Sequence, residues 1–307
     1  MTVHKVSPYT HQNCRSLLQK AVRRGCISLI PKVVNHLVEV GDTPWLVSRT
    51  GVIVFEESWP LGILLDKELN TESITQILIE TAISQKQKDA AGLGSLSYEF
   101  SKGDSSDFTN SSSFQPVQDI AEAIQKPEGF WQRMKDNVQN QPQKEMLIDK
   151  AYASFKRAGW PWDRAFMQAA AYLATMENIP TIEKCTSLIC SENDFPFWIA
   201  IDKHTEEGKQ AIKKVAEKVG INARKVSWIS FYFSSAVENE MLPSPWWKRE
   251  MDWRLYKIGL SRFEAEKLWM QIKPRLFEEL FEKGEQLQSH ISTNHEKDQE
   301  TIQLSFF

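Results

Sequence analysis

The most constraining feature of this sequence is the helical spacing of its apolar residues. Residues 30–38 follow the i, i+3, i+4, i+7, i+8 pattern of one helix face: Ile30, Val33, Val34, Leu37 and Val38. The pattern returns in residues 261–280, where Ser261 and Glu264 have the spacing of a capping box. Only 13 Gly and 13 Pro are present, which is few for an all-β chain. We therefore predict a mainly α fold.

Two short apolar runs are compatible with either a strand or a buried helix. FPFWIAID (195–202) and VSWISFYF (226–233) each have the length and composition of a strand. Short apolar runs also occur in buried helices, so the pattern does not distinguish the two. We expect a mostly helical region here, with a short strand pair as the alternative.

The size and composition place the chain among ordinary globular proteins. Its 307 residues suggest about two domains. Apolar residues make up 41% and charged residues 25% of the chain, and no apolar run approaches the roughly 18 residues of a bilayer span. The first residues lack the apolar segment of a signal peptide, and four cysteines are too few for a disulfide scaffold. We expect a cytoplasmic, nucleoid-associated protein without a membrane partner.

The charge balance argues against a chain that binds nucleic acid over its whole surface. Lys and Arg number 37 against 40 Asp and Glu, a net charge of −3. DNA contact therefore requires a local basic patch, with tryptophans as stacking platforms. The candidate DNA-binding residues are Lys20, Arg23, Arg24, Lys213, Lys214, Arg224, Lys225, Trp246, Trp247, Lys248 and Arg249. The alternatives are solvated helix faces for the cations and core positions for the tryptophans.

No recognised catalytic or metal motif is present. Asp202 and His204 can form an acid/base pair, but residues with this spacing before a helix more often form a turn and a cap. Cys185 and Cys190 lack the second ligand pair of a zinc site, so we interpret them as small buried residues. We predict no catalytic residue, no metal and no cofactor.

Two stretches of the sequence resemble one protein family. Residues 16–62 contain a basic turn, an acid-Gly-Asp turn and a doubled acid, with matches at Lys20, Arg23, Arg24, Gly41, Asp42, Arg49, Glu56 and Glu57. Residues 159–175 contain a Gly-x-Pro turn and a helix of small residues, with matches at Gly159, Pro161, Gln168, Ala169, Tyr172, Leu173 and Ala174. Both resemble the helical collar of the replication-associated recombination protein A family, AAA+ ATPases related to clamp loaders.

The resemblance implies a helical fold that mediates oligomerisation. It implies a helix over 45–57, against the β-propensity of the Val-Ile-Val-Phe run there. It also implies, as partners, an AAA+ ATPase, clamp-loader subunits or further copies of this chain. The family's ATPase half is missing, because no G-x-x-x-x-G-K-[ST] motif is present. ATP hydrolysis is therefore not expected.

These observations predict five segments. Collar-like helical regions occupy 1–91 and 115–190, on either side of a Ser-rich segment at 92–114 whose composition predicts a flexible loop. A mostly helical domain follows at 191–287. Residues 288–307 are predicted to be a disordered tail.

The last five residues resemble a known docking peptide. Gln303-Leu304-Ser305-Phe306-Phe307 is similar to the bacterial sliding-clamp-binding peptide, whose usual form is Gln-Leu-Ser/Asp-Leu-Phe. When such a peptide binds the clamp, two apolar side chains fill pockets on the clamp surface. The glutamine amide forms a hydrogen bond at the rim of these pockets. The alternative is a tail whose apolar end folds back onto the protein.

The sequence thus favours a non-catalytic accessory factor in DNA replication or repair that binds the DNA polymerase sliding clamp. One alternative is a non-ATPase subunit of a clamp-loader-like assembly. Another is a nucleic-acid-processing enzyme with a site in 190–260.

Overall fold

The computed structural model describes residues 11–66, 68–104, 114–186 and 190–304, with side chains described up to residue 293. Helices make up nearly all of its regular structure, and only isolated β-bridges join residues of the described ranges. The mainly α prediction is confirmed. Among these residues, no helix is both long and apolar enough to span a bilayer.

The chain forms two compact units, and each is assembled from separate stretches. The first unit consists of Met1–Thr43, Ile189–Val237 and Arg254–Phe307. The second consists of Pro44–Leu188 and Glu238–Trp253. The contiguous segments predicted from the sequence do not coincide with these units, because the contacts that close each unit join residues far apart in the chain.

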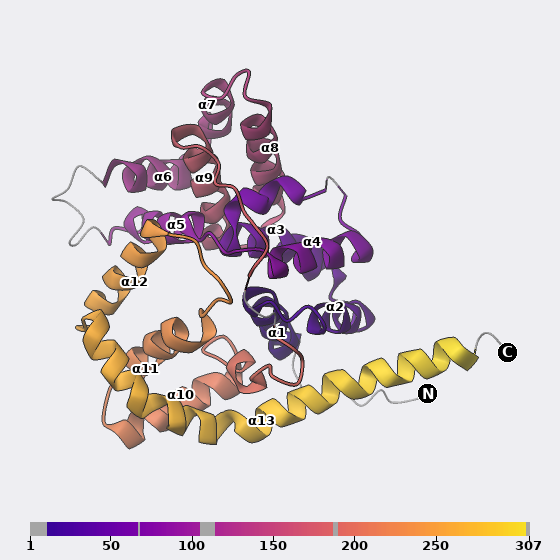
Figure 1. Ribbon diagram of the computed structural model, residues 1–307. Coiled ribbons are helices and arrows are strands. Elements are labelled where there is room, and N and C mark those ends of the chain that lie inside the picture. The colour runs from indigo at the N-terminus through magenta and orange to yellow at the C-terminus, as the bar shows by residue number, and fades with distance from the viewer. Residues whose placement is uncertain (1–10, 67, 105–113, 187–189, 305–307) are drawn as a thin grey trace. The chain divides into compact units, whose positions relative to one another are not determined.

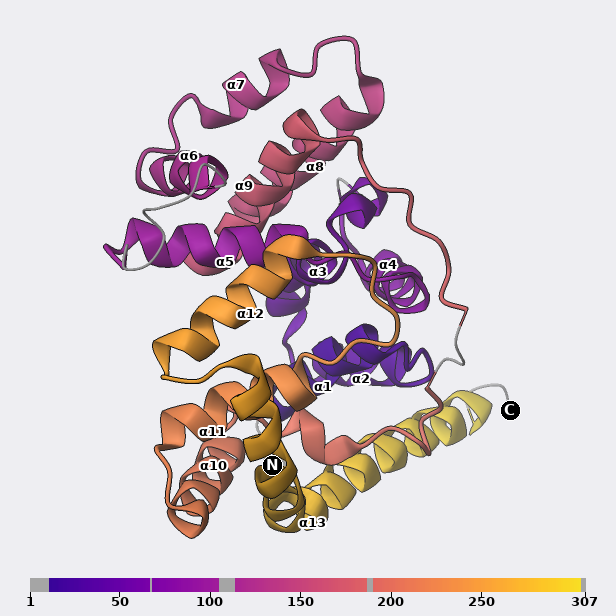
Figure 2. The same cartoon turned by 60° about the vertical axis from the view of Figure 1, so that its left-hand side comes forward.

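The first unit is organised around the carboxy-terminal helix. It contains α1 (His11–Arg24), α2 (Leu29–Glu39), η3 (Phe197–Ala200), α10 (Glu206–Val219), α11 (Ala223–Ser230), the π-helical turn η4 (Phe231–Ser235) and α13 (Arg262–Leu304). Helix α13 packs against η3, α10, α11 and α2, and it is the long yellow helix of Figures 1 and 2. The helices predicted near both ends of the chain are therefore present and pack in one unit.

Helix α13 corrects the prediction of a disordered tail. The Ser261–Glu264 capping box is present, with the Ser261 backbone N 2.7 Å from a Glu264 carboxylate oxygen. The helix then continues to Leu304, well beyond residue 288. Buried Leu287 and Ile291 hold this part of α13 against the unit. The polar composition after Gly284 concealed these two anchoring residues.

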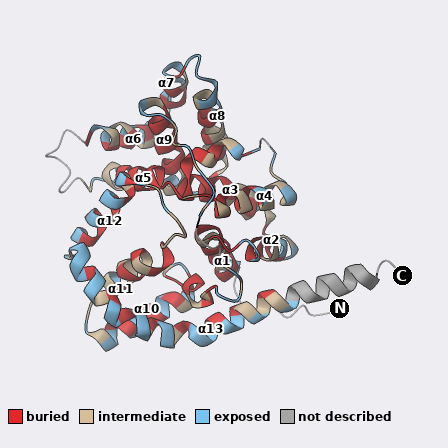
Figure 3. Ribbon diagram, viewed as in Figure 1, coloured by how far each residue is buried: buried red, intermediate tan, exposed pale blue. Residues whose placement is uncertain are grey.

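The second unit consists of helices packed around α5 and α9. In chain order it contains the following elements: most of α3 (Thr43–Glu57), η1 (Trp59–Leu64), α4 (Thr71–Ile83), α5 (Asp89–Ser101), α6 (Gln115–Gln125), α7 (Phe130–Asp136), α8 (Pro142–Arg157), α9 (Pro161–Met176) and the first nine residues of α12 (Pro245–Lys257). Helix α5 packs against α6 and α9, and α9 also packs against α8. Figure 3 shows α5 and α9 mostly in the colour of buried residues.

Helix α5 occupies part of the segment that we predicted to be a flexible loop. Residues 89–101 are helical, and Leu93, Leu96 and Ser97 are buried. A Gly- and Ser-rich helix forms because small residues let α5 approach its neighbours closely. A Cβ atom on Gly94 would lie 2.8 Å from the Ala165 carbonyl oxygen of α9. Residues 105–113 of the predicted loop lie outside the described residues.

Three ambiguous stretches are also resolved. Residues 43–57 form α3, as the collar resemblance implied and against local β-propensity. Neither apolar run at 195–202 or 226–233 is a strand, since the first contains η3 and the second belongs to α11 and η4. The strand-pair alternative is therefore wrong.

Candidate functional site

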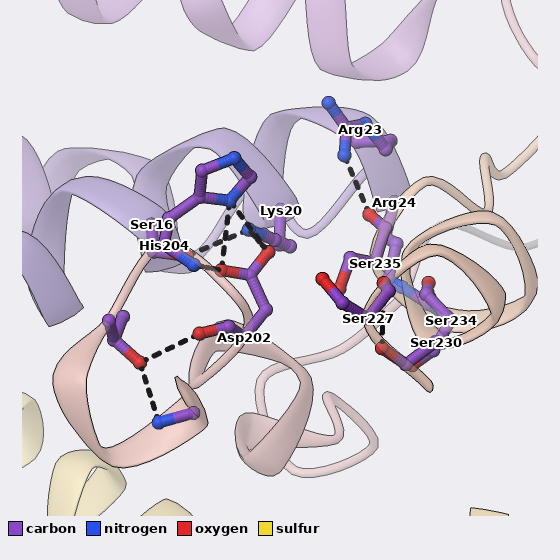
Figure 4. Close-up of polar contacts among 12 residues, drawn as sticks. Ser16, Lys20, Arg23, Arg24, Asp202, His204, Ser227, Ser230, Ser234 and Ser235 are labelled. Carbon is purple, nitrogen blue, oxygen red and sulfur yellow. Dashed lines mark hydrogen bonds and ion pairs between the residues drawn. The ribbon is translucent and has the colours of Figure 1, made fainter. Parts of the chain in front are cut away.

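A buried ion pair lies at the centre of the first unit, where α1 meets the turn before α10. Lys20 Nζ is 2.6 Å from Asp202 Oδ2 and donates a second hydrogen bond to Ser16 Oγ at 2.7 Å. Both charged side chains are almost completely buried. Figure 4 shows Lys20 and His204 pointing at the same carboxylate. The pair joins residues that are far apart in the chain.

Asp202 also fixes the local turn. The backbone N and Nδ1 of His204 lie 2.9 and 3.0 Å from Asp202 Oδ1. Thr205 then caps α10, because its hydroxyl accepts a hydrogen bond from the Gly208 backbone N at 3.1 Å. The turn-and-cap interpretation of Asp202 and His204 is therefore confirmed.

The electrostatics keep Asp202 ionised. Burial by itself raises the pKa of this carboxyl, but the Lys20 ammonium and His204 outweigh burial and hold the pKa well below its usual range. An Asp that orients a His can support proton transfer. The His204 side chain is accessible to a substrate, because it is 52% exposed. Asp202 is shared with Lys20, however, and no nucleophile lies among the described contacts of His204. The geometry supports a structural role.

Two of the predicted DNA contacts on α1 are buried instead. Lys20 forms an ion pair with Asp202, and Arg23 donates to the Ser235 carbonyl oxygen at 2.6 Å. Half-buried Arg24 donates to the Ser234 carbonyl at 2.8 Å. Both carbonyls belong to the last two residues of η4 (Figure 4), and the Ser234 carbonyl also accepts a hydrogen bond from the Val237 backbone N at 3.2 Å. The basic turn of α1 thus closes the first unit, and the prediction that Lys20 and Arg23 contact phosphates is wrong.

The cations of α10 and α11 lie on the surface. Lys213, Lys214 and Arg224 are exposed, and Lys225 is half-buried. Lys214 and Lys218 both pair with Glu279 of α13, at 3.3 and 2.7 Å. These surface pairs contribute little to stability but orient α10 against α13.

An aromatic cluster lies beside this basic surface. Lys203 Nζ is 3.5 Å from the ring centroid of Trp228 and 4.0 Å from that of Phe231. The Arg254 guanidinium is 4.5 Å from the Trp228 centroid. These cation–π contacts were not predicted, because nothing in the local sequence brings Lys203 or Arg254 to Trp228.

The tryptophan cluster at 246–249 belongs to the second unit. Trp247 is 8% exposed, and the ammonium of Lys88 lies 4.3 Å from its ring centroid. Trp246 is half-buried with the Arg249 guanidinium 4.8 Å from its ring. Lys248 and Arg249 are exposed. Trp247 is a core residue, so its predicted role in base stacking is wrong.

Two buried lysines of the second unit were missed by the sequence analysis. Lys88 Nζ lies 2.8 Å from Glu238 and 3.4 Å from Glu57. Lys86 donates to the Thr81, Ala82 and Ser84 carbonyls at the end of α4. Burial lowers the pKa of Lys86 to about 8. No sequence signal separates these lysines from surface lysines.

The described residues contain no group of three or more His, Cys, Asp or Glu side chains that can hold a metal ion. Cys185 and Cys190 are only half-buried, and they belong to different units. The predicted clamp-binding residues Gln303 and Leu304 lie in the backbone of α13, but their side chains lie outside the described residues. Ser305, Phe306 and Phe307 lie outside them entirely.

No protein-family model, curated protein or solved structure matches this chain.

Proposed function

We propose that this protein is a non-catalytic accessory factor in DNA replication or repair that binds the polymerase sliding clamp through residues 303–307. The observation that carries the proposal is the position of this peptide at the end of α13. Ile291 is the last residue of α13 described as buried, and the helical backbone continues to Leu304. The helical backbone rises about 20 Å over the thirteen residues from Ile291 to Leu304. The motif therefore begins in the last two residues of α13, which supports a role for this end of the helix in docking.

The chemistry of the peptide supports a weak, exchangeable contact. Burial of Leu304, Phe306 and Phe307 in apolar pockets contributes about 1.5–3 kcal/mol each. Immobilising these side chains on the clamp costs about 0.5–1.5 kcal/mol each. With hydrogen bonds to the pocket rim, the balance corresponds to a dissociation constant on the order of micromolar. A protein that shares a clamp with other factors requires such affinity.

The proposal predicts that residues 303–307 are necessary for clamp binding. Deletion of these residues, or Leu304→Ala combined with Phe307→Ala, removes the side chains that fill the pockets. We expect isothermal titration of the full chain into the sliding clamp of its own cell to give micromolar binding, and either variant to weaken it at least about 100-fold. Ile302→Ala, just outside the motif, is the matched control and should bind like the unaltered chain.

A second titration tests whether the peptide is sufficient. Residues 298–307 fused to an unrelated carrier should bind the clamp with an affinity close to that of the full chain. Unchanged binding after the deletion refutes the proposal. So does binding by the fused peptide but not by the full chain, because that result means the tail is held by its own protein.

A further inference from the structure

Helices α10 and α11 are joined by a turn of three residues, 220–222. Gly220 has a φ of 74°, a left-handed conformation that favours glycine. The backbone N atoms of Gly220 and Ile221 both lie within hydrogen-bond distance of the Ala216 carbonyl oxygen, at 2.9 and 3.1 Å. Asn222 then begins α11 by accepting a hydrogen bond from the Arg224 backbone N at 2.7 Å. The turn is therefore specified on both sides by its own residues.

The two helices pack on each other through a small apolar core. Val215 and Ala216 of α10 and Val226 and Ile229 of α11 are buried. Ala216 lies one turn before Gly220, where its small side chain permits close approach. Two packed helices joined by a three-residue turn with a left-handed glycine share the connection length and turn chemistry of a helix-turn-helix.

The outward face of the second helix carries groups suited to duplex DNA. Arg224 is exposed, and Ser227 and Trp228 on the same face are half-exposed. Within the described part of the chain, the Arg224 side chain forms no hydrogen bond or ion pair. Lys203 and Arg254 place two more cations at the Trp228 ring. An unengaged arginine on a recognition-type helix is suited to a guanine edge or a phosphate.

The local charge differs in sign from that of the whole chain. Residues 206–230 contain six Lys and Arg and three Glu, whereas the chain carries a net charge of −3. Two of the glutamates, Glu206 and Glu207, lie in the first turn of α10, and Lys209 pairs with Glu206 at 2.6 Å. Exposed Lys213 lies one turn beyond Lys209. The basic excess is therefore concentrated on the two helices that the turn joins.

We infer that α10 and α11 form a helix-turn-helix that binds duplex DNA, with α11 entering the major groove and α10 crossing the phosphate backbone. Arg224 and Ser227 face the base edges, and Lys213 contacts a phosphate. This binding is independent of the terminal peptide, so loss of clamp binding and loss of DNA binding are separate outcomes.

Fluorescence anisotropy with a labelled mixed-sequence duplex of about 24 base pairs, slightly over two helical turns, tests the inference. The protein is the full chain, at about 50 mM and about 200 mM salt. We expect binding that weakens steeply with salt and that exceeds binding of the same single strand. Arg224→Ala should reduce affinity roughly 5- to 150-fold. Lys213→Ala should lower the slope of log affinity against log salt by about one.

Lys273→Ala is the matched control, because it removes the same charge from an exposed position on α13. Its affinity should stay within about twofold of the unaltered chain, as expected for a surface change outside the interface. Circular dichroism checks that the variants fold. Equal losses in Arg224→Ala and Lys273→Ala overturn the inference, as does the absence of duplex binding at the lower salt. Stronger binding to double-stranded RNA or to the single strand overturns it as well.

Discussion

At the scale of single residues, buried charges hold the first unit together. Lys20, Arg23 and Asp202 are all nearly inaccessible, and each has a polar partner from a distant part of the chain. Removal of one partner of a buried ion pair leaves the other charge uncompensated. This lowers the free energy of unfolding far more than the loss of a surface pair does. Substitution of any of these residues is therefore expected to destabilise the first unit.

Asp202→Asn tests this role. The substitution leaves the Lys20 ammonium buried without its counter-charge, so we expect the free energy of unfolding at pH 7 to fall by about 3–5 kcal/mol. The pKa of Asp202 is lower in the folded than in the unfolded protein. Its stabilising effect is therefore present above about pH 4 and is lost as the pH falls through the folded pKa.

Urea denaturation from pH 7 to pH 3 measures both effects. The difference in the free energy of unfolding between the unaltered chain and Asp202→Asn should shrink below about pH 4. Glu206→Gln, on the exposed start of α10, is the control and should change stability little at any pH. A difference that stays constant across this range contradicts the assigned role of the Asp202 charge.

At the scale of elements, small residues determine how closely helices approach. Gly94 of α5 faces the α9 backbone, where an added Cβ atom would lie 2.8 Å from the Ala165 carbonyl oxygen. Gly92 faces α12, with the Trp247 backbone N 2.3 Å from the same hypothetical atom. A helix that composition alone assigns to a loop is thus stabilised by close packing with its neighbours.

Gly94→Ala should destabilise the protein by about 1–3 kcal/mol, because the α5 and α9 backbones cannot both keep their positions. Gly159→Ala is the matched control, since no heavy atom beyond its two chain neighbours lies within 4 Å of its added Cβ. We expect the control to be neutral or slightly stabilising. Thermal unfolding monitored by circular dichroism compares the two, and equal melting temperatures would show that the α5–α9 approach is not limiting.

Helix existence could be predicted from the sequence, but tertiary partners could not. Apolar spacing placed α2 and the start of α13, and the Ser261–Glu264 capping box marked a helix start correctly. Lys20 and Arg23 looked like a basic surface because their partners lie about 180 and 210 residues further along the chain. The helix-turn-helix was missed although Gly220 is visible in the sequence, because the run after it resembled a strand.

At the scale of the whole molecule, the first unit depends on a helix from the end of the chain. Helix α13 packs against α2, α10, α11 and η3, whereas the second unit ends at Trp253. Removal of α13 therefore takes away apolar burial from one unit and no residue from the other. The two units should respond differently to truncation.

A chain ending at Ser261 should keep the second unit and lose the first. Hydrogen exchange followed by mass spectrometry should show α5 and α9 still protected, and α1 and α10 exchanging near the unfolded rate. A chain ending at Thr293 retains Ile291 and should keep protection in both units. Protected α1 in the shorter chain would contradict the central role of α13.

The interleaved connectivity of the two units has a consequence during synthesis. Helices α1 and α2 leave the ribosome first, but Ile291, which closes their unit, is made about 250 residues later. Translation adds roughly 5–20 residues per second, so the apolar faces of those helices remain without their partner for about 12–50 s. The other unit has all its residues earlier. The nascent chain therefore carries an unfinished amino-terminal segment whose exposed apolar faces are suited to chaperone binding.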